Sequence, residues 1–178
     1  AVRLGANVIS MSIGQGADNN RRNDIETRAV NYAVQHGVLV AVSASNNGNS
    51  ASVIAPNIMY EPGTSQGRYR PLNSGTIANP AAASAALTVG AENSSKGYDS
   101  DMAIYSSWGP LADFTLKPDV SAPGDNITST GNNNTYIQMS GTSMAAPYAA
   151  GVSLLVMQYL KHNTNLQGAA LVQAAKAM

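Results

Sequence analysis

The sequence contains no cysteine, only two histidines and few charged residues. Without cysteine, the chain can form neither a disulfide framework nor a thiolate metal site. Ten Lys plus Arg balance ten Asp plus Glu, so there is no electrostatic case for binding nucleic acid or an anionic membrane surface. Charged residues make up 11% of the chain, well below the roughly 25% of an average protein. Asn, Ser, Thr and Gly supply the polarity instead.

The sequence also lacks a convincing membrane span. Its longest apolar segment, residues 144–160, contains Pro147, Ser153 and Gln158, and is too short and too polar to cross a bilayer. The 178 residues are enough for one domain with a sizeable core, and we find no internal repeat or linker. We therefore expect one α/β domain over residues 1–178.

The first third of the chain has the pattern of a β-α-β unit. Residues 7–14 form a short apolar run that ends at a glycine, and residues 23–37 have apolar side chains near helical spacing. Residues 38–44 and 86–92 are rich in apolar and β-branched side chains, which is typical of strands buried on both faces of a parallel sheet. Shorter strands are expected at 102–108, 126–130 and 135–139.

A long, proline-containing stretch separates the two buried strands. It is too long for an ordinary βα loop and contains four of the eight prolines. Such stretches are usually functional or are insertions. We predict a loop-rich insertion at about residues 49–75.

The segment MSGTSMAAP, residues 139–147, places Thr142 and Ser143 where a β-like segment turns into the apolar run 144–160. That run is apolar nearly all round, which predicts a buried helix. At the start of a buried helix, the macrodipole and unpaired N–H groups favour negative charge, including that of a developing oxyanion. A simple N-cap at Thr142 or Ser143, worth about 1 kcal/mol, is the alternative interpretation.

Four ordered blocks make the sequence recognisable. GTSMAAP followed by AAG closely resembles the nucleophile motif of the subtilisin-like serine peptidases. VISMSIG is similar to the strand that lines their cleft, VAVSASNNGN to the strand ending in their oxyanion asparagine, and LKPDVSAPG to a further family block. The stretch SSWGPLADFTLKPDVSAPG most resembles the cell-envelope peptidases of bacteria. The resemblance implies a three-layer α/β fold, with a mostly parallel sheet and helices on both faces. It also implies a secreted or cell-surface location.

The resemblance implies a serine endopeptidase with a polypeptide substrate. Ser143 would be the nucleophile that forms an acyl-enzyme. Its backbone N–H and the side-chain amide of Asn46 would bind the oxyanion. Without the serine block, Asn46 alone would be interpreted as a turn residue.

The resemblance also implies how substrate is bound. Backbone groups of one segment would pair with an extended substrate as an added strand, while other residues would line the cleft and the pocket for the residue before the cut. The strand-pairing residues are Ser12, Ile13 and Gly14, and the lining residues are Ala44, Ser45 and Thr142. Two departures from the family's pattern add volume near the pocket. Ser45 and Ala78 stand where glycine is usual, so acceptance of a large aromatic side chain is in doubt.

The family's catalytic Asp and His precede the cleft strand, and neither has a counterpart in this chain. His36 and His162 lie near predicted helix ends and outside any family motif, so we expect structural roles for both. We therefore expect the C-terminal portion of a catalytic domain that is inactive alone. The strand near Val8 to Ser12 would have an unpaired backbone edge. The missing N-terminal portion or a second copy of the chain would pair with this edge.

No cofactor is predicted. Relatives often bind calcium, but the oxygen-rich residues 17–24 and 98–101 match no defined calcium loop, so structural calcium remains open without a supporting motif. Two other functions remain as alternatives. One is a catalytically inactive, subtilase-like binding domain. The other is a related acid-acting peptidase family, which has aspartate at the oxyanion position, and Asn46 argues against it.

Overall fold

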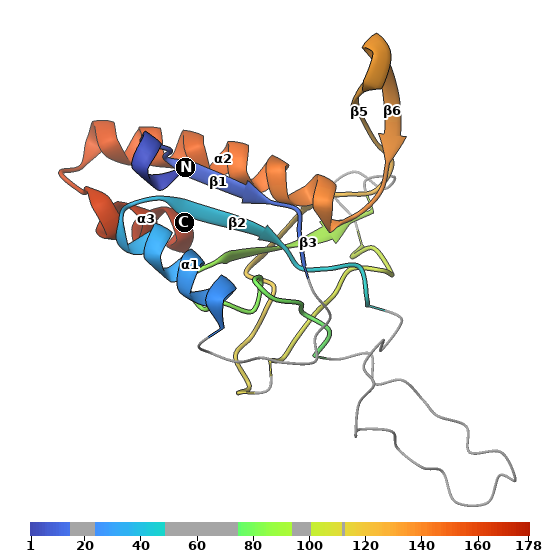
Figure 1. Cartoon of the computed structure of the whole chain (residues 1–178), viewed down its shortest axis with the longest axis horizontal. Helices are drawn as coiled ribbons and strands as arrows, with labels where there is room; N and C mark the ends of the chain where they lie inside the picture. Colours follow the sequence, from blue (N-terminus) through green and yellow to red (C-terminus); the bar gives the residue numbers. More distant parts are fainter. Residues whose placement is uncertain (15–23, 49–74, 94–100, 112) are drawn as a thin grey trace, which may run out of the picture.

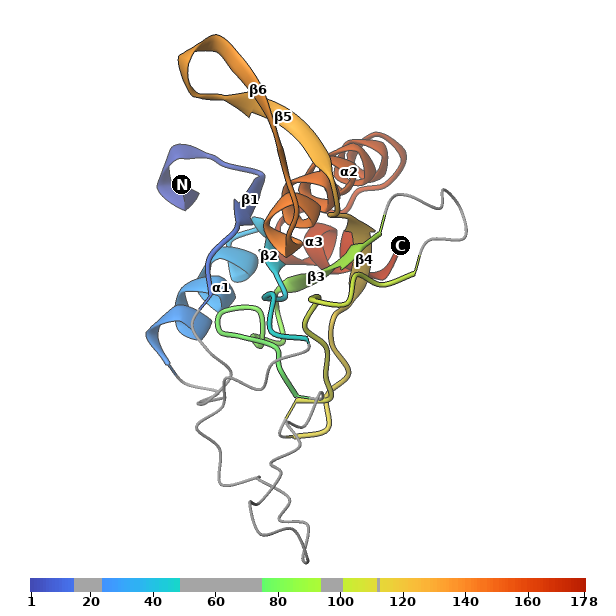
Figure 2. The same cartoon turned by 90° about the vertical axis from the view of Figure 1, so that its right-hand side faces the viewer.

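The centre of the computed structural model is a parallel sheet whose strands lie in the order β1-β2-β3-β4 (Figures 1 and 2). The structure describes residues 1–14, 24–48, 75–93, 101–111 and 113–178. All three pairings in this sheet are parallel, so the carboxyl ends of the strands meet at one edge. The strands are β1 (Val8–Met11), β2 (Leu39–Ser43), β3 (Leu87–Glu92) and β4 (Val120–Pro123).

Helices cover both faces of the sheet. Helix α1 (Ile25–Gln35) packs on β2, and α2 (Thr142–Asn163) crosses all four strands on the opposite face (Figure 1). Helix α3 (Gly168–Ala177) packs against both helices near the amino ends of the strands. Two short 3₁₀ turns, η1 (Val2–Leu4) and η3 (Asn132–Asn134), complete the helical elements of the described residues. The predicted fold class, a parallel sheet between helices, is confirmed.

The sequence patterns explain the central elements. Every residue of β2 is buried, as is expected of a continuous apolar run in the middle of a parallel sheet. Helix α1 begins at Asp24, whose carboxylate accepts the backbone N–H of Thr27 at 2.6 Å. The helix ends before Gly37, whose φ of 80° lies in the left-handed region that favours glycine. The predicted helix over residues 23–37 is therefore confirmed.

One predicted strand is absent from the structure, and two observed elements were not predicted. Residues 102–108 do not form a strand, and their only ladder contact is an isolated bridge from Met102 to Glu92. The segment instead donates hydrogen bonds to other loops, including one from the N–H of Ser107 to the carbonyl of Ser45 at 2.9 Å. Strand β4 and helix α3 were not predicted. Strand β4 is a short edge strand with proline and polar residues, so it has no continuous apolar run.

The prediction that the long helix is buried nearly all round is wrong for this chain. One row of α2 faces the sheet and is buried, and it includes Ala145, Ala146, Ala149 and Met157. The opposite side exposes large apolar side chains, with Leu155 66% and Tyr159 59% exposed. A helix apolar on all sides is normally covered on all sides, but nothing in the described part of the chain covers this face.

A second open surface lies beside that helix face. Strand β1 pairs only with β2, so in the described residues no strand pairs with its outer backbone edge. The two short strands predicted at 126–130 and 135–139 are present as β5 (Ile127–Gly131) and β6 (Thr135–Met139). They pair as a hairpin that projects from the body of the molecule beyond the start of α2 (Figure 2). Every residue of β6 is exposed.

Two further predictions stay open. The proposed insertion at 49–75 lies outside the described residues except for Gly75, so the domain assignment stays a prediction. No helix in the described ranges is long and apolar enough to cross a membrane.

Candidate active site

Ser143 is the second residue of α2. The start of this helix lies at the edge of the sheet toward which β1 and β2 point (Figure 1). The hydroxyl of Ser12, just past the end of β1, donates to the carbonyl of Ser143 at 2.9 Å. This bond joins the predicted cleft strand to the first turn of the helix. The N-cap residue of α2 is Gly141, so neither Thr142 nor Ser143 occupies the capping position. The simple capping interpretation of Thr142 or Ser143 is therefore wrong.

Asn46 follows β2 and lies against the start of α2, although 96 residues separate it from Thr142 in the sequence. Its side-chain Oδ1 accepts the backbone N–H of Thr142 and the Thr142 hydroxyl, both at 2.9 Å. Thr142 is buried, so this contact is shielded from water. Because Oδ1 takes both bonds, the orientation of the amide is fixed. Its Nδ2 remains a donor without a hydrogen-bond partner among the described residues.

Gly141 keeps open a small space between two N–H donors. Its φ of 154° and ψ of 160° belong to a region essentially reserved for glycine. A Cβ at this position would lie 3.2 Å from Nδ2 of Asn46 and 3.6 Å from the backbone N of Ser143. Both donors are therefore within reach of one point in that space. An oxyanion hole requires such an arrangement, with donors at about 2.7–3.1 Å from the developing negative charge.

The loop that carries Asn46 is fastened to the segment that was predicted as a strand. Ser45 has a φ of 94°, which is uncommon for a residue other than glycine. Ser107, fully buried, donates its N–H to the Ser45 carbonyl at 2.9 Å and accepts the N–H of Asn47 on its hydroxyl at 3.0 Å. The Asn47 side chain donates to the Ser45 hydroxyl at 3.1 Å. These bonds hold a strained turn in place.

Sequence reasoning missed Ser107, because a serine in the stretch SSWG carries no local signal for this contact. It missed Tyr105 for the same reason. The Tyr105 hydroxyl donates to the carbonyl of Gly124 at 3.0 Å, and the same carbonyl accepts the N–H of Gly141 at 2.7 Å. Burial, assisted by the negative charge of Asp125, raises the pKa of Tyr105, so the hydroxyl keeps its proton and remains a donor.

The predicted cleft residues lie near the same edge of the sheet. Ser12 and Ile13 are exposed, whereas Ala44 is buried and accepts the N–H of Ala78 on its carbonyl at 3.3 Å. A Cβ added to Gly14 would lie 3.2 Å from the Cβ of Ala78. The methyl group of Ala78 therefore fills space directly beside the segment that was predicted to bind substrate.

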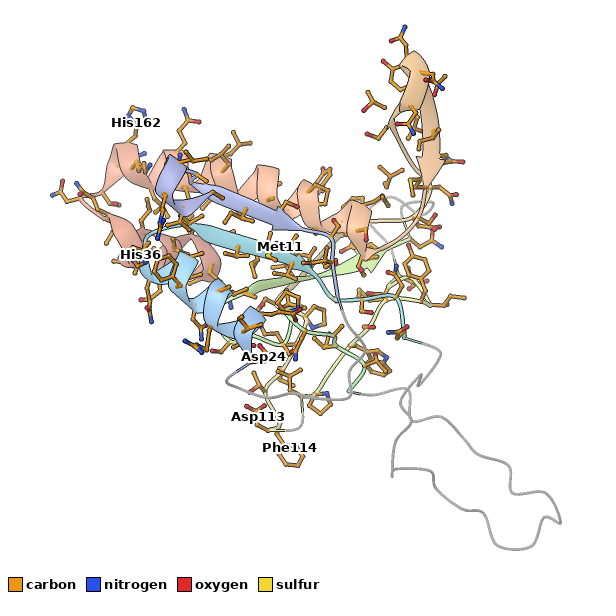
Figure 3. All side chains as sticks on the ribbon, viewed as in Figure 1. Met11, Asp24, His36, Asp113, Phe114 and His162 are labelled. Atoms are coloured by element: carbon orange, nitrogen blue, oxygen red, sulfur yellow. The ribbon has the colours of Figure 1, made fainter. Side chains whose placement is uncertain are left out.

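The only two histidines of the chain lie far from Ser143. His36 follows α1, where its Nδ1 is 2.8 Å from the carbonyl of Tyr32 and its ring packs against the Tyr32 ring. His162 is in the last turn of α2, about 28 Å along the helix axis from Ser143 at 1.5 Å per residue. Figure 3 shows both histidines beyond the amino ends of the strands, away from Met11. Neither can take a proton from Ser143.

No metal cluster accompanies this arrangement in the described ranges, which contain no group of three or more His, Cys, Asp or Glu side chains placed to hold an ion. Of the two acidic stretches considered from the sequence, 17–24 and 98–101, only Asp24 and Asp101 lie within the described residues. Asp24 caps α1 and also accepts the side-chain amide of Asn79 at 2.6 Å.

Comparison with known proteins identifies the family. The model of the subtilase family matches residues 1–177. The chain belongs to the subtilase family. It is 44% identical over 85 residues to the PII-type proteinase of Lactococcus lactis subsp. cremoris, a match that covers 43% of this chain and 4% of that protein. It is 33% identical over 170 residues to the serine protease AprX of Bacillus subtilis (strain 168), covering 85% of this chain and 33% of AprX.

Solved structures show the same fold. The chain is similar to sphericase with a TM-score of 0.64 and 30% sequence identity, over 94% of this chain and 46% of that one. This subtilase chain therefore spans a third or less of the two curated relatives and just under half of the solved one.

Proposed function

We propose that this subtilase chain supplies the nucleophile and the oxyanion hole of a serine endopeptidase, with Ser143 as the nucleophile. The observation that carries the proposal is the convergence of the Asn46 Nδ2 and the Ser143 N–H on the space beside Gly141. Helix starts with serines are common. Here the Ser143 N–H and the Asn46 Nδ2, which has no hydrogen-bond partner among the described residues, both reach one point in space, and this arrangement is suited to one task. That task is to hold negative charge as it develops.

The chemistry follows from this geometry. The Ser143 hydroxyl attacks a substrate carbonyl, and its proton passes to a base. The carbonyl oxygen becomes an oxyanion that accepts hydrogen bonds from Asn46 and from the Ser143 backbone. Collapse of the tetrahedral intermediate breaks the C–N bond, and the base returns the proton to the leaving amine. Water then hydrolyses the acyl-enzyme by the same steps in reverse.

Neither histidine of this chain can be the base, because both lie at the opposite end of the sheet from Ser143. The base must therefore come from additional polypeptide. We propose that an N-terminal portion of the same domain carries a histidine and an aspartate. It would cover the exposed face of α2 and pair with the open edge of β1. The exposed Leu155 and Tyr159 side chains and the unpaired edge are both suited to such a partner. Self-association of two chains through the same edge is the competing use of this surface.

The substrate proposed is a polypeptide in extended conformation, bound beside Ser12, Ile13 and Gly14 as an added strand. A secreted or cell-surface location in a bacterium is proposed from the resemblance to cell-envelope peptidases. The competing function is an inactive, subtilase-like binding domain, and it predicts that no partner segment makes Ser143 reactive.

Covalent labelling of Ser143 distinguishes these functions. The chain is extended at its amino terminus by the residues encoded before Ala1 and treated with a fluorophosphonate probe. We expect fast, stoichiometric labelling that the Ser143→Ala variant abolishes, because only an activated serine reacts with such probes. If the extended chain contains a histidine and an aspartate in the family's positions and still does not label, it is a binding domain.

The buried methyl group of Ala78 should restrict the residue before the cut. Small or medium apolar side chains should be cleaved faster than aromatic ones, because one methyl-sized group changes discrimination by about 1–3 kcal/mol. In the extended chain, Ala78→Gly should raise kcat/KM for a peptide ending in Phe by roughly tenfold or more relative to its Ala counterpart. Matched peptides ending in Ala, Leu and Phe measure this ratio. A wild-type preference for Phe would show that Ala78 does not limit the pocket.

A further inference from the structure

Residues 105–107 contact both sides of the space in which the oxyanion is proposed to form. On one side lies the loop that carries Asn46, residues 45–48, which we call the asparagine loop. On the other side lies the turn that precedes Ser143 at the start of α2. We call residues 105–107 the positioning segment. It is the one stretch of the described residues that bonds to the asparagine loop and, through one carbonyl, to that turn.

The asparagine loop is bound to the positioning segment at both of its ends. Ser107 donates its N–H to the first residue of the loop at 2.9 Å and accepts the N–H of the third at 3.0 Å. At the other end, the Gly48 N–H donates to the Tyr105 carbonyl at 2.8 Å. A Cβ added to Gly48 would lie only 2.3 Å from the Ser106 carbonyl oxygen, so the two backbones are in direct contact.

The Tyr105 side chain acts on the other side of the space. Its hydroxyl donates to the Gly124 carbonyl at 3.0 Å, and the same carbonyl accepts the Gly141 N–H at 2.7 Å. A Cβ added to Gly124 would lie 2.8 Å from the Gly141 carbonyl oxygen, so these two glycine backbones pack directly against each other. Because Gly141 is the N-cap of α2, a shift of the Gly124 carbonyl would move the turn that carries the Ser143 N–H.

The positioning segment is itself fixed to the central sheet. The hydroxyl of Ser106, which is 5% exposed, accepts the backbone N–H of Ala91 in β3 at 3.0 Å. The N–H of Ala103 donates to the Ala91 carbonyl at 2.9 Å, and the Ser106 N–H donates to the Ala103 carbonyl at 2.8 Å. The segment therefore gives both donors a common support on β3.

Both donors need such a support, because each lies beside a backbone conformation that is held by its surroundings. Ser45 has a φ of 94°, and strained residues of this kind persist only where neighbouring bonds hold them. Gly141 has a φ of 154° and a ψ of 160°, which are essentially limited to glycine. Donors must lie within about 0.5 Å of the productive geometry, and a misplacement of about 1 Å can cost roughly 10²-fold in rate.

We propose that Tyr105 and Ser107 are positioning residues that set the separation of the two oxyanion donors. Ser107 holds the side-chain amide of Asn46 through the asparagine loop. Tyr105 holds the Ser143 N–H through the Gly124 carbonyl. Each acts only through the donor that it supports. The inference rests on the proposed function, since it requires an oxyanion at the point where the two donors meet.

Two single variants of the extended chain test the inference. Ser107→Ala removes the acceptor of one loop N–H, and Tyr105→Phe removes the donor to the Gly124 carbonyl. Each should lower kcat by about tenfold with KM unchanged, because a displaced donor weakens binding of the transition state alone. The affinity for a peptide aldehyde, whose adduct with an active serine is tetrahedral, should fall by the same factor.

Matched controls remove the same groups elsewhere. Ser153→Ala deletes a buried hydroxyl that donates to the Ala149 carbonyl at 2.8 Å within α2. Tyr32→Phe deletes a hydroxyl from the ring that packs on His36, at the opposite end of the sheet from Ser143. Both controls should leave kcat, KM and the affinity for the aldehyde unchanged. Thermal unfolding of all four variants shows how much of any loss follows from stability.

Combination with Asn46→Ala separates positioning from a general loss of structure. Once the amide is absent, Ser107 has no donor to position, so Ser107→Ala should have little further effect on kcat. Tyr105→Phe should keep its effect in the same background, because the Ser143 N–H is still present. A purely structural role of Ser107 would instead lower kcat by the same factor in both backgrounds.

The outcomes distinguish the inference from the proposed function. If Asn46→Ala leaves kcat unchanged, both fail. If Asn46→Ala lowers kcat but Ser107→Ala costs the same factor in both backgrounds, or if either test variant behaves like its control, the positioning role of that residue is wrong and the oxyanion hole stands. If Ser107→Ala does not fold, Ser107→Cys provides the same comparison, because sulfur is a weaker acceptor on a side chain of similar shape.

Discussion

The 178-residue chain alone is expected to hydrolyse peptides about 10⁶-fold more slowly than the same chain carrying a histidine and aspartate from an N-terminal portion of its domain. Removing the catalytic histidine costs a member of this family roughly that factor in kcat. Neither histidine of the chain is within reach of the Ser143 hydroxyl, since His36 and His162 lie at the far end of the described residues. The oxyanion donors by themselves leave only about 10³–10⁴ of acceleration over water.

The measurement compares kcat of the isolated chain with that of the extended chain on one peptide, together with the rate of fluorophosphonate labelling. Circular dichroism of the isolated chain must first show that it is folded, so that a slow rate reflects chemistry and not loss of structure. Ser143→Ala in the isolated chain sets the background. If the isolated chain labels at the rate of an active peptidase, one of its own residues acts as the base and our assignment is wrong.

Supplying the N-terminal portion as a separate polypeptide adds a second readout. If it pairs with β1 and covers α2, labelling of Ser143 should appear on mixing and increase saturably with its concentration. Truncating exposed side chains on α2, for example Leu155→Ala, should weaken that saturation without changing the final rate. Self-association through the open edge would compete, so labelling would fall as the concentration of the isolated chain rises relative to the partner.

The sequence predicted the central elements because their patterns are local. Strands β2 and β3 are buried on both faces and are therefore continuous apolar runs, and α1 has a capping residue at one end and a glycine at the other. Strand β4 escaped prediction because an exposed edge strand with a proline has no such run. The segment 102–108 was apolar enough for a strand, but only Ala103 and Ser106 form hydrogen bonds with β3, and its other bonds to distant segments go to loops.

The candidate site was reached through family resemblance, because its geometry is not local. The bonds from Thr142 to Asn46 span 96 residues, and no periodicity in either segment predicts them. The opposite exposure of the two sides of α2 could not be predicted either. Its residues are apolar all round, and which side is covered depends on chain outside the helix. The roles of Ser143, Asn46 and the cleft residues stay predictions until activity is measured.

Closing the space beside Gly141 should abolish most of the activity of the extended chain. In Gly141→Ala the new methyl group would lie 3.2 Å from Nδ2 of Asn46 and 3.6 Å from N of Ser143, where the oxyanion has to be. Asn46→Ala removes one donor and should lower kcat by about 10²–10³ with little change in KM, the loss found for this donor in a member of the family. Gly141→Ala should lose at least as much, because it blocks both donors.

Gly168→Ala is the matched control, since it makes the same change at another glycine of positive φ, 55°, where an added Cβ meets nothing within 4 Å. It should leave kcat unchanged and lower stability, because alanine is strained at that φ. Thermal unfolding separates the two effects. In Gly141→Ala the strained φ lowers the stability of the fold, whereas the added methyl group displaces the oxyanion of the transition state. The loss in kcat should therefore be far larger than the loss of stability explains. If Gly141→Ala folds and keeps its kcat within a few-fold of wild type, the oxyanion does not occupy that space, and the proposed roles of Asn46 and the Ser143 N–H fail together.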